Sequence, residues 1–385
     1  MKIALVHDWL TGMRGGERVL HHLARRFPEA DLYTLFHVPG SVSPEIERLR
    51  IRTSLLDRLP GTARHYRKWL PLLPWAIRRF DLSGHDLVLS TSHAVAKSIR
   101  VPEGGVHVDY CFTPMRYIWD HVDAYVGRGP RRWLATPLIG ALRRFDVRTS
   151  GPSSVTRFIA ISREVARRIQ HHYGRQAAVV PPPVDLSWIR PAEGPAEEFY
   201  LLVGGFVPYK REALVIETFR RLDRRLVVVG AGPGREALMR DAPANVEFTG
   251  RVPDAVLADL YRRCRALIHP QHEDFGLVAV EAQAAGRPVI AFGAGGVLDS
   301  VLPLPGTARP DSRGSDGDRI ESAAPTGVFF HEATTDGLAV AIEAFEKAEA
   351  VFDPARIRRH AETFSPARFD RDLDREIRIA LEQRS

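Results

Sequence analysis

Cysteine and long apolar runs are both scarce in this sequence, and each absence excludes a class of protein. Cys111 and Cys264 are the only cysteines among 385 residues, which argues against a disulfide framework or a four-ligand zinc site and fits a reducing cytosol. The apolar segment at residues 69–77 is short and is broken by Pro71 and Pro74, so it falls below the ~18 residues of a membrane-spanning helix. The first eight residues turn polar too early for a signal peptide. We therefore expect a cytoplasmic protein.

Acidic residues are scarce in the first half of the chain. Residues 1–190 contain 29 Lys and Arg against 16 Asp and Glu, whereas residues 191–385 contain 25 against 31. The net charge of +7 therefore comes from the first half, which predicts an anionic partner there: nucleic acid, a membrane surface or a phosphorylated substrate. The basic excess lacks a zinc finger, a helix-turn-helix signature and an aromatic RNA-binding motif, so we expect no nucleic acid partner.

The remaining pattern is an alternation of short apolar runs with helical periodicity. At 385 residues, with 44% hydrophobic and 26% charged residues, the chain has the composition of a soluble globular enzyme of two or three domains. Strand-like and helical segments alternate throughout, which predicts two doubly wound α/β domains facing a central cleft. The Pro-rich tract from Pro181 to Glu198 is the expected boundary between them. Residues 301–325 are rich in Pro, Gly, Ser and Asp, which predicts a mobile loop.

The stretch from His272 to Glu281 is the most informative segment. It lies between two apolar runs and is expected to form a turn and a helix that starts near Gly276. Glu273 then lies in the loop at the helix N-terminus, and Glu281 lies on the helix body. A carboxylate beside free backbone N–H groups suits a ligand with both hydroxyls and phosphate. An ordinary helix with acidic residues near its start explains the same spacing.

A glycine-rich turn follows the first predicted strand. Gly12, Gly15 and Gly16 let a substrate approach the backbone at a helix N-terminus. Their spacing matches neither the Walker nor the G-x-G-x-x-G pattern, so the turn is not a standard nucleotide fingerprint. A flexible turn without a ligand remains the alternative.

Two later strands end in polar residues that deserve a functional interpretation. In open α/β sheets, ligands collect beyond the carboxyl ends of the strands. His93 and Lys97 follow the strand at residues 85–90, and Arg116 follows the strand at residues 106–112. These three side chains are therefore candidate ligand-binding residues, although a single histidine is more often structural.

Residues 64–80 and 131–148 both interleave Arg and Lys with Trp and Leu. This mixture suits a segment at a membrane interface, because the rings enter the headgroup layer while the cations meet anionic lipid. Two ordinary amphipathic helices with solvated basic faces are the alternative.

Together these stretches resemble the family 4 retaining glycosyltransferases of GT-B fold, and among them the mannosyltransferases of bacterial polysaccharide assembly. The most specific element is Glu273 and Glu281 with Phe275-Gly276-Leu277 between them. Supporting elements are Gly15-Gly16-Glu17, residues 92–97, 110–119 and 207–211, Gly295-Gly296 and the terminal helix beginning Phe364-Ser365. The resemblance implies two Rossmann-like domains, an acceptor-binding domain at residues 1–190 and a donor-binding domain at residues 191–364. It also implies that the helix at about residues 365–385 packs back on the first domain.

The resemblance also implies a role for each matching residue. Glu281 would bind the nucleotide ribose and Glu273 the hydroxyls of the donor sugar. Lys210 would neutralise the leaving phosphate, because a cation at ~4 Å is worth on the order of 4 kcal/mol at an effective dielectric of 20, and no metal would be required. The remaining implied residues are Gly276, Leu277 and Val278 for the diphosphate, Gly15, Gly16 and Arg211 for the phosphate region, His93 as a catalytic residue, and Arg116, Tyr117 and Trp119 for the acceptor.

Two positions depart from the family pattern. Relatives carry Arg a few residues before Lys210, where this chain has Gly205-Phe206, and they carry His where this chain has Phe112. Arg211 and His93 are the candidate replacements. Each loss, if uncompensated, is expected to lower the rate about 100-fold or more.

The sequence therefore favours a transferase that moves a hexose, mannose from GDP-mannose, onto a lipid-linked glycan in cell-surface polysaccharide synthesis. We expect it to lie on the inner face of the cytoplasmic membrane, to contact the anionic membrane surface, and to need no cofactor beyond its nucleotide-sugar substrate. The first alternative is a GT-B protein that binds a nucleotide sugar or glycan without turnover, favoured by Gly205 and Phe112. The second is a sugar-nucleotide epimerase.

Overall fold

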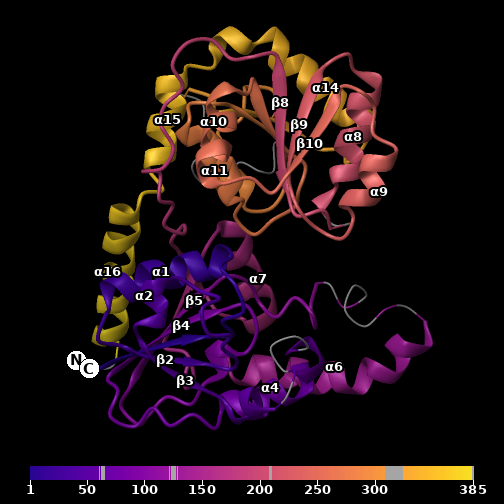
Figure 1. Ribbon diagram of the computed structural model, residues 1–385. Coiled ribbons are helices and arrows are strands. Elements are labelled where there is room, and N and C mark those ends of the chain that lie inside the picture. Colours follow the sequence, from indigo (N-terminus) through magenta and orange to yellow (C-terminus); the bar gives the residue numbers. More distant parts are fainter. Residues whose placement is uncertain are drawn as a thin grey trace. The chain divides into compact units, whose positions relative to one another are not determined.

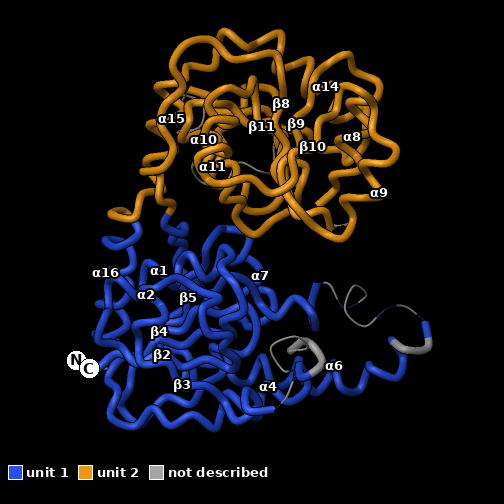
Figure 2. Tube along the Cα trace, in the orientation of Figure 1, with its two compact units in different colours: residues 1–183, 369–385 blue, residues 184–368 orange. Residues whose placement is uncertain are grey.

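The structure of the chain is a computed structural model that describes residues 1–59, 61, 66–120, 122, 127, 129–207, 210–307 and 324–383. The chain divides into two compact units (Figure 2): residues 1–183 with 369–385 form unit 1, and residues 184–368 form unit 2. The chain changes unit between Pro183 and Val184, at the end of the three consecutive prolines. This point lies inside the predicted boundary tract from Pro181 to Glu198 and before residue 190, where the resemblance implies that the first domain ends. Each unit is a doubly wound α/β domain.

Unit 1 is built on a parallel sheet with strand order β3-β2-β1-β4-β5-β6-β7 (Figure 1). Its central strands are buried along nearly their whole length, as expected of parallel strands covered on both faces. The order reverses between β1 and β4, which makes their carboxyl ends the topological switch point. The strands are β1 (Ile3–His7), β2 (Asp31–Thr34), β3 (Arg50–Thr53), β4 (Leu87–Ser92), β5 (Val106–Cys111), β6 (Arg157–Ala160) and β7 (Ala177–Val179).

The helices of unit 1 follow its strands. Helix α7 has a serine N-cap: Ser162 Oγ accepts a hydrogen bond from Val165 N at 3.2 Å, and the helix ends at Gly174 in the left-handed conformation. The helices are α1 (Gly15–Arg26), α2 (Pro44–Glu47), α4 (Leu73–Ile77), α6 (Pro130–Arg148), α7 (Arg163–Tyr173) and α16 (Pro366–Glu382), with short 3₁₀ segments η1 (Leu55–Arg58), η2 (Tyr66–Leu72) and η3 (Ala96–Ser98).

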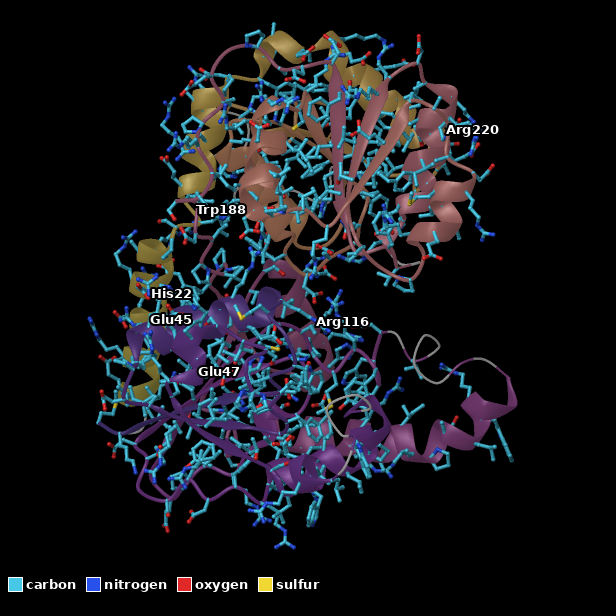
Figure 3. The ribbon with its side chains drawn as sticks, in the orientation of Figure 1. His22, Glu45, Glu47, Arg116, Trp188 and Arg220 are labelled. Atoms are coloured by element: carbon cyan, nitrogen blue, oxygen red, sulfur yellow. The ribbon has the colours of Figure 1, made fainter. Side chains whose placement is uncertain are left out.

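The C-terminal helix α16 packs on unit 1. Phe369 is buried, with its ring centroid 5.5 Å from that of Tyr110. His22 on α1, labelled in Figure 3, has its Nε2 at 2.8 Å from Asp370 Oδ1, and Arg26 forms an ion pair with the same carboxylate at 3.0 Å. Aromatic packing and paired charges therefore hold the two ends of the chain in one unit.

Unit 2 repeats the architecture with strand order β10-β9-β8-β11-β12-β13, and its switch point lies between β8 and β11. Its strands are β8 (Phe199–Gly204), β9 (Arg225–Gly230), β10 (Val246–Gly250), β11 (Ala266–His269), β12 (Val289–Phe292) and β13 (Gly327–Phe330). Its helices are α8 (Glu212–Arg221), α9 (Arg235–Arg240), α10 (Asp254–Arg263), α11 (Leu277–Ala284), α12 (Val297–Ser300), α14 (Thr335–Lys347) and α15 (Pro354–Glu362), with a 3₁₀ segment η6 (Glu349–Val351). The predicted pair of doubly wound α/β domains is confirmed.

Two predicted segments extend beyond what the structure describes. Most of the expected mobile loop, residues 308–323, lies outside the described residues, as do residues 64 and 65 of the first basic segment. The rest of that segment forms η2 and the short helix α4, because Pro71 and Pro74 prevent a long α-helix. Among the described residues, the structure contains no helix long and apolar enough to cross a membrane.

Candidate active site

The switch point of unit 2 brings two predicted residues together. Lys210 lies at the end of the loop after β8, and Glu273 lies in the loop after β11. Lys210 Nζ is 3.1 Å from Glu273 Oε1, and the two side chains are 23% and 25% exposed. The pair is therefore formed and still open to solvent, where a ligand can compete for both charges.

The loop after β8 is held in a conformation that non-glycine residues rarely adopt. Phe206 and Arg211 both have positive φ angles, 45° and 61°. The buried carboxylate of Glu212 fixes the loop from beneath, because its Oε1 accepts a hydrogen bond from Phe206 N at 2.9 Å. Burial raises the pKa of Glu212 above its usual value. Backbone strain that is stabilised by neighbours in this way is typical of ligand-binding loops.

Arg211 connects the two loops of the unit 2 switch point. Its Nη1 donates to Pro270 O at 3.3 Å, and its guanidinium lies over the ring of Phe292 at 4.1 Å. Burial lowers the pKa of Arg211. Its charge is therefore already engaged by a carbonyl and a ring.

Helix α11 begins beside this ion pair and offers an anion site. Gly276 is its N-cap, in the left-handed conformation with φ 86°, and no side chain of the described residues caps the first turn by a hydrogen bond. The backbone N–H groups of Leu277 and Val278 thus stand at an open helix N-terminus, which favours phosphate. The predicted position of Glu273 before the helix and of Glu281 on its body is confirmed.

Two further contacts shape the site. Gly296 N donates to Glu273 O at 2.8 Å, and a Cβ at Gly296 would stand 2.0 Å from Asp274 O, so this close approach requires glycine. On α11, Glu281 is 5% exposed, and its Oε2 accepts a hydrogen bond from Tyr261 OH at 2.9 Å.

Sequence reasoning missed two polar residues at the end of β11. His269 is 1% exposed and Gln271 is 2% exposed. Within the described part of the chain, both ring nitrogens of His269 and the Oε1 atom of Gln271 have no hydrogen-bond partner. The available signal was a histidine at the end of an otherwise apolar run that leads directly into the Glu273 loop.

The switch point of unit 1 is organised by Asp8. Its fully buried carboxylate accepts four backbone hydrogen bonds of 2.7–2.8 Å, from the N–H groups of residues 93–96. The predicted residue His93 lies here, with Nδ1 at 3.2 Å from Asp8 Oδ2 and its ring against Trp9 at 4.5 Å. Burial lowers the pKa of His93, which Asp8 opposes.

Gly15 and Gly16 open helix α1 at the same switch point. A Cβ at Gly16 would lie 3.2 Å from Phe112 Cε2, so Phe112 packs directly on this glycine. His7 lies beneath, with Nε2 at 3.9 Å from Glu17 Oε1. Burial opposes ionisation of Glu17, but the interactions with His7 lower its pKa overall.

The predicted acceptor residues differ in their burial and contacts. Tyr117 is 7% exposed, and Trp119 stacks on His172 at 4.3 Å while its Nε1 donates to Asp146 Oδ2 at 2.8 Å. Both rings therefore support the loop from inside unit 1, whereas Arg116 is half-buried and is labelled in Figure 3. Lys97, also singled out in the sequence, is buried in an ion pair with Asp146.

Protein-family comparisons decide the family. The family model described as "Glycosyltransferase Family 4" matches residues 13–188, and the one described as "Glycosyl transferases group 1" matches residues 189–304. The chain belongs to the family 4 glycosyltransferases. The second match contains the whole switch point of unit 2, and the first contains Gly15, Gly16 and His93, whereas β1 and Asp8 precede it.

Curated relatives match this glycosyltransferase over part of their length. The D-inositol 3-phosphate glycosyltransferase of Segniliparus rotundus is 31% identical over 227 residues, which is 47% of this chain and 51% of the relative. The GDP-mannose-dependent alpha-mannosyltransferase of Mycolicibacterium smegmatis is 40% identical over 102 residues, 26% of this chain and 27% of the relative. The chain thus spans about half the length, or less, of these relatives.

Solved structures establish the fold of this glycosyltransferase. Anabaena HepE in complex with UDP has a TM-score of 0.68 at 16% identity and covers 98% of this chain and 99% of its own. Sucrose-phosphate synthase from Thermosynechococcus elongatus has a TM-score of 0.67 at 16% identity, with full coverage of both chains. The predicted GT-B fold is confirmed.

Proposed function

We propose that this family 4 glycosyltransferase transfers a hexose from a nucleotide sugar, with retention of configuration, and that unit 2 binds the donor. The observation that carries the proposal is the Lys210–Glu273 pair beside the open N-terminus of α11. A cation, a carboxylate and uncapped backbone N–H groups at one switch point match a ligand that contains both a diphosphate and sugar hydroxyls.

Donor binding would redistribute the charges of this site. The diphosphate would take the N–H groups of Leu277 and Val278 and compete with Glu273 for Lys210. Glu273 would then accept hydrogen bonds from sugar hydroxyls, and Glu281 would do the same for the ribose. As the nucleoside diphosphate leaves, Lys210 at ~4 Å would stabilise its growing charge by on the order of 4 kcal/mol at an effective dielectric of 20.

Other assigned roles remain proposals. Arg211 would support the phosphate region; Gly15, Gly16 and His93 would serve the reaction from the switch point of unit 1; and Arg116, with Tyr117 and Trp119 holding its loop, would contact the acceptor. Metal independence is likewise proposed, because Lys210 and the N-terminus of α11 supply the positive charge that a metal would otherwise provide.

For the donor we propose GDP-mannose. The relative named as a GDP-mannose-dependent alpha-mannosyltransferase has the highest identity of the two curated relatives described above, although over about a quarter of this chain. The solved Anabaena structure contains UDP, so UDP and UDP-glucose are the competing ligands to test.

For the acceptor we propose a lipid-linked glycan at an anionic membrane. Exposed apolar residues of η2, α4 and α6 lie among arginines in unit 1, and Figure 1 shows α6 extending from the rest of the unit. We call this set the basic apolar surface. It consists of Leu72, Trp75, Trp133, Leu134 and Leu138 with Arg78, Arg79, Arg132, Arg144 and Arg148.

Charge supports an anionic bilayer as the occupant of the basic apolar surface. Trp133 is 77% exposed and Leu134 is 71% exposed. Burial lowers the pKa of Arg78, and the neighbouring charges of Arg100 and Arg148 lower it further, which shows how closely the cations gather. The boundary between lipid headgroups and acyl chains binds exposed rings that are surrounded by cations.

Calorimetric titration with GDP-mannose, GDP, UDP-glucose and UDP tests the donor site. We expect binding of one base class, weakened at least 10-fold in Lys210→Met and Glu281→Gln. A matched control exists on α14, where Lys347 and Glu343 form an exposed ion pair at 3.9 Å. Lys347→Met should bind as the wild type does. Failure of all four ligands to bind would reject the proposal.

A GT-B protein that binds without turnover is the second candidate. Gly205 favours this candidate. A Cβ at position 205 would stand 3.8 Å from Lys210 Nζ, and because glycine has no side chain, position 205 supplies no second charge next to Lys210. Incubation with the donor alone separates the candidates. Slow hydrolysis indicates a transferase, conversion to an isomeric sugar nucleotide indicates an epimerase, and an unchanged donor that is nevertheless bound indicates the binding protein.

A further inference from the structure

His269 lies directly beneath the start of α11. A Cβ on Gly276 would stand 3.1 Å from His269 Nε2, so the ring packs against the left-handed turn that opens the helix. The side chain is 1% exposed, and within the described part of the chain neither ring nitrogen has a hydrogen-bond partner. Buried polar atoms are nearly always paired. A buried imidazole with two unpaired nitrogens under an open helix N-terminus therefore points to a ligand-bound state in which the ring is satisfied.

Gln271 supports the same conclusion independently. It is 2% exposed, its Oε1 has no partner among the described residues, and its Nε2 makes a long hydrogen bond of 3.4 Å to Val203 O. The last residue of β11 and the second residue after it thus both leave polar atoms unpaired. The polar groups at this end of the strand are incomplete at two places, next to the Glu273 loop.

The charges of Glu273 and Lys210, which both act on His269, offset each other, so a positive charge on the His269 ring would not face an unpaired cation. Glu273 and Lys210 act on the ring in opposite directions, and they pair with each other at 3.1 Å. Its partner on β12 is Ala291, and the neighbouring pair on β8 and β11 is Leu202 with Ile268, so the flanking strands contribute no charge here. Two other charged residues of the donor site are already engaged, Arg211 by Pro270 O and the Phe292 ring, and Glu281 by Tyr261.

We propose that His269 is an additional residue of the donor site and takes up one proton from solvent when the diphosphate of a nucleotide sugar binds at the N-terminus of α11. The proposal rests on the donor site proposed above. The imidazolium has two N–H donors, one for each ring nitrogen that lacks a partner among the described residues, and its charge offsets part of the diphosphate. His269 would then provide a positive charge beside Lys210 that depends on pH.

The direction of the proton exchange follows from the surroundings. Burial lowers the pKa of His269, Lys210 lowers it further and Glu273 opposes this, so the ring is neutral in the free protein near neutral pH. A bound anion favours the charged ring and raises its pKa. Between the pKa values of the free and bound states, affinity for the nucleotide sugar falls up to about 10-fold for each unit of rising pH.

Calorimetry in two buffers of different ionisation enthalpy counts the protons. The probe is GDP-mannose or UDP-glucose, whichever binds, because free nucleotides carry a terminal phosphate that itself titrates near pH ~6. We expect wild-type protein to take up as much as one proton, and His269→Phe and His269→Gln to take up none and to lose the pH dependence of affinity. His360 on α15 provides the control: its side chain is half-buried and burial lowers its pKa too, but its Nε2 already contacts Ser300 O at 3.1 Å. His360→Gln should retain the uptake.

The possible outcomes separate the two proposals. Binding of a nucleotide sugar without proton uptake, or with the same uptake in His269→Phe and His269→Gln, overturns the role of His269 and leaves the donor site standing. If wild-type protein binds neither nucleotide sugar, the donor site is wrong and the role of His269 fails with it. Two variants are used so that misfolding of one, seen by circular dichroism, does not remove the test.

Discussion

Asp8 and His93 directly follow the neighbouring strands β1 and β4 and meet at the switch point of unit 1, with Asp8 Oδ2 at 3.2 Å from His93 Nδ1. The same carboxylate accepts the backbone N–H groups of residues 93–96, so a single buried charge fixes the whole turn after β4. Such a carboxylate sets both the position of the turn and the orientation of the imidazole. Asp8 therefore holds the turn and His93 in place.

Asp8→Asn is expected to destabilise the protein by about 3 kcal/mol or more, because the amide lacks the charge and leaves some of these buried N–H groups unsatisfied. Urea unfolding measures the change. Asp81→Asn is the control, since Asp81 is exposed and its Oδ1 accepts a hydrogen bond from Ser83 N at 2.9 Å. Equal midpoints for the two variants would contradict the structural role of Asp8.

A buried network in unit 1 predicts two opposing effects of pH on stability. Ser90 Oγ contacts His107 Nε2 at 2.7 Å and donates to Asp109 Oδ1 at 2.6 Å. Burial raises the pKa of Asp109 from 3.8 to about 7 and lowers that of His107 from 6.5 to about 4. Asp109 and His107 contact the same hydroxyl, and burial shifts their pKa values in opposite directions.

The direction of each pH effect on stability follows from the number of protons bound by the folded and by the unfolded chain. Between pH ~4 and ~7 folded Asp109 holds a proton that the unfolded chain has released, so its contribution to stability falls as pH rises. Between pH ~4 and ~6.5 the unfolded chain binds a proton on His107 that the folded protein does not, so that contribution rises with pH. In the wild type the two contributions, each on the order of 3 kcal/mol, largely cancel.

Single variants expose each contribution. The free energy of unfolding of Asp109→Asn should rise from pH ~4 to ~6.5, and that of His107→Gln should fall from pH ~4 to ~7. Urea unfolding at a series of pH values, with the wild type alongside, measures both slopes. Slopes of the same sign in the two variants would show that the network does not titrate in this way.

The periodicity of apolar runs was enough to predict both sheets, and spacing alone placed Glu273 before α11 and Glu281 on it. Gly276 made the helix start predictable, because a glycine before an apolar helical run permits the left-handed turn that the structure shows. Local chemistry of this kind depends on neighbours in the chain, which a sequence displays directly.

The residues that sequence reasoning missed depend on contacts between distant segments. Asp8 and Glu212 are ordinary acidic residues until the fold places backbone N–H groups around them, and His269 is an ordinary strand residue until Gly276 lies over it. Tyr117 and Trp119 show the converse: the motif is recognisable in the sequence, but only packing against Met115, Asp146 and His172 reveals that both rings face inward.

Gly296→Ala should impair the donor site while leaving unit 2 folded. The added Cβ would stand 2.0 Å from Asp274 O and 2.4 Å from Phe275 Cα, both backbone atoms, so the Glu273 loop must move. A displacement of about 1 Å at a reacting group lowers rates on the order of 100-fold. Steady-state transfer or donor hydrolysis measures the loss.

Gly140→Ala is the matched control for that experiment. Gly140 lies inside α6, where a Cβ would meet only Arg144 Nη1 at 3.8 Å, and alanine should stabilise the helix by about 0.5–1 kcal/mol. Wild-type activity in both variants would contradict the role of the Gly296 contact, since the two substitutions are chemically identical.

The basic apolar surface predicts binding to anionic vesicles. Trp133→Ser with Leu134→Ser removes the two most exposed apolar side chains of α6 without touching buried residues. Because binding combines apolar insertion with attraction between arginine and anionic lipid, we expect the double variant to bind phosphatidylglycerol vesicles at least 10-fold more weakly. Raised salt should weaken the binding of the wild type as well, and phosphatidylcholine vesicles should bind neither protein.

Val340→Ser on α14 of unit 2 is the control. The side chain of Val340 is 64% exposed, so the substitution removes a comparable apolar group, and this variant should bind vesicles as the wild type does. Equal binding of the double variant and the wild type in a vesicle flotation assay would show that η2, α4 and α6 are two solvated basic segments, the alternative that the sequence left open.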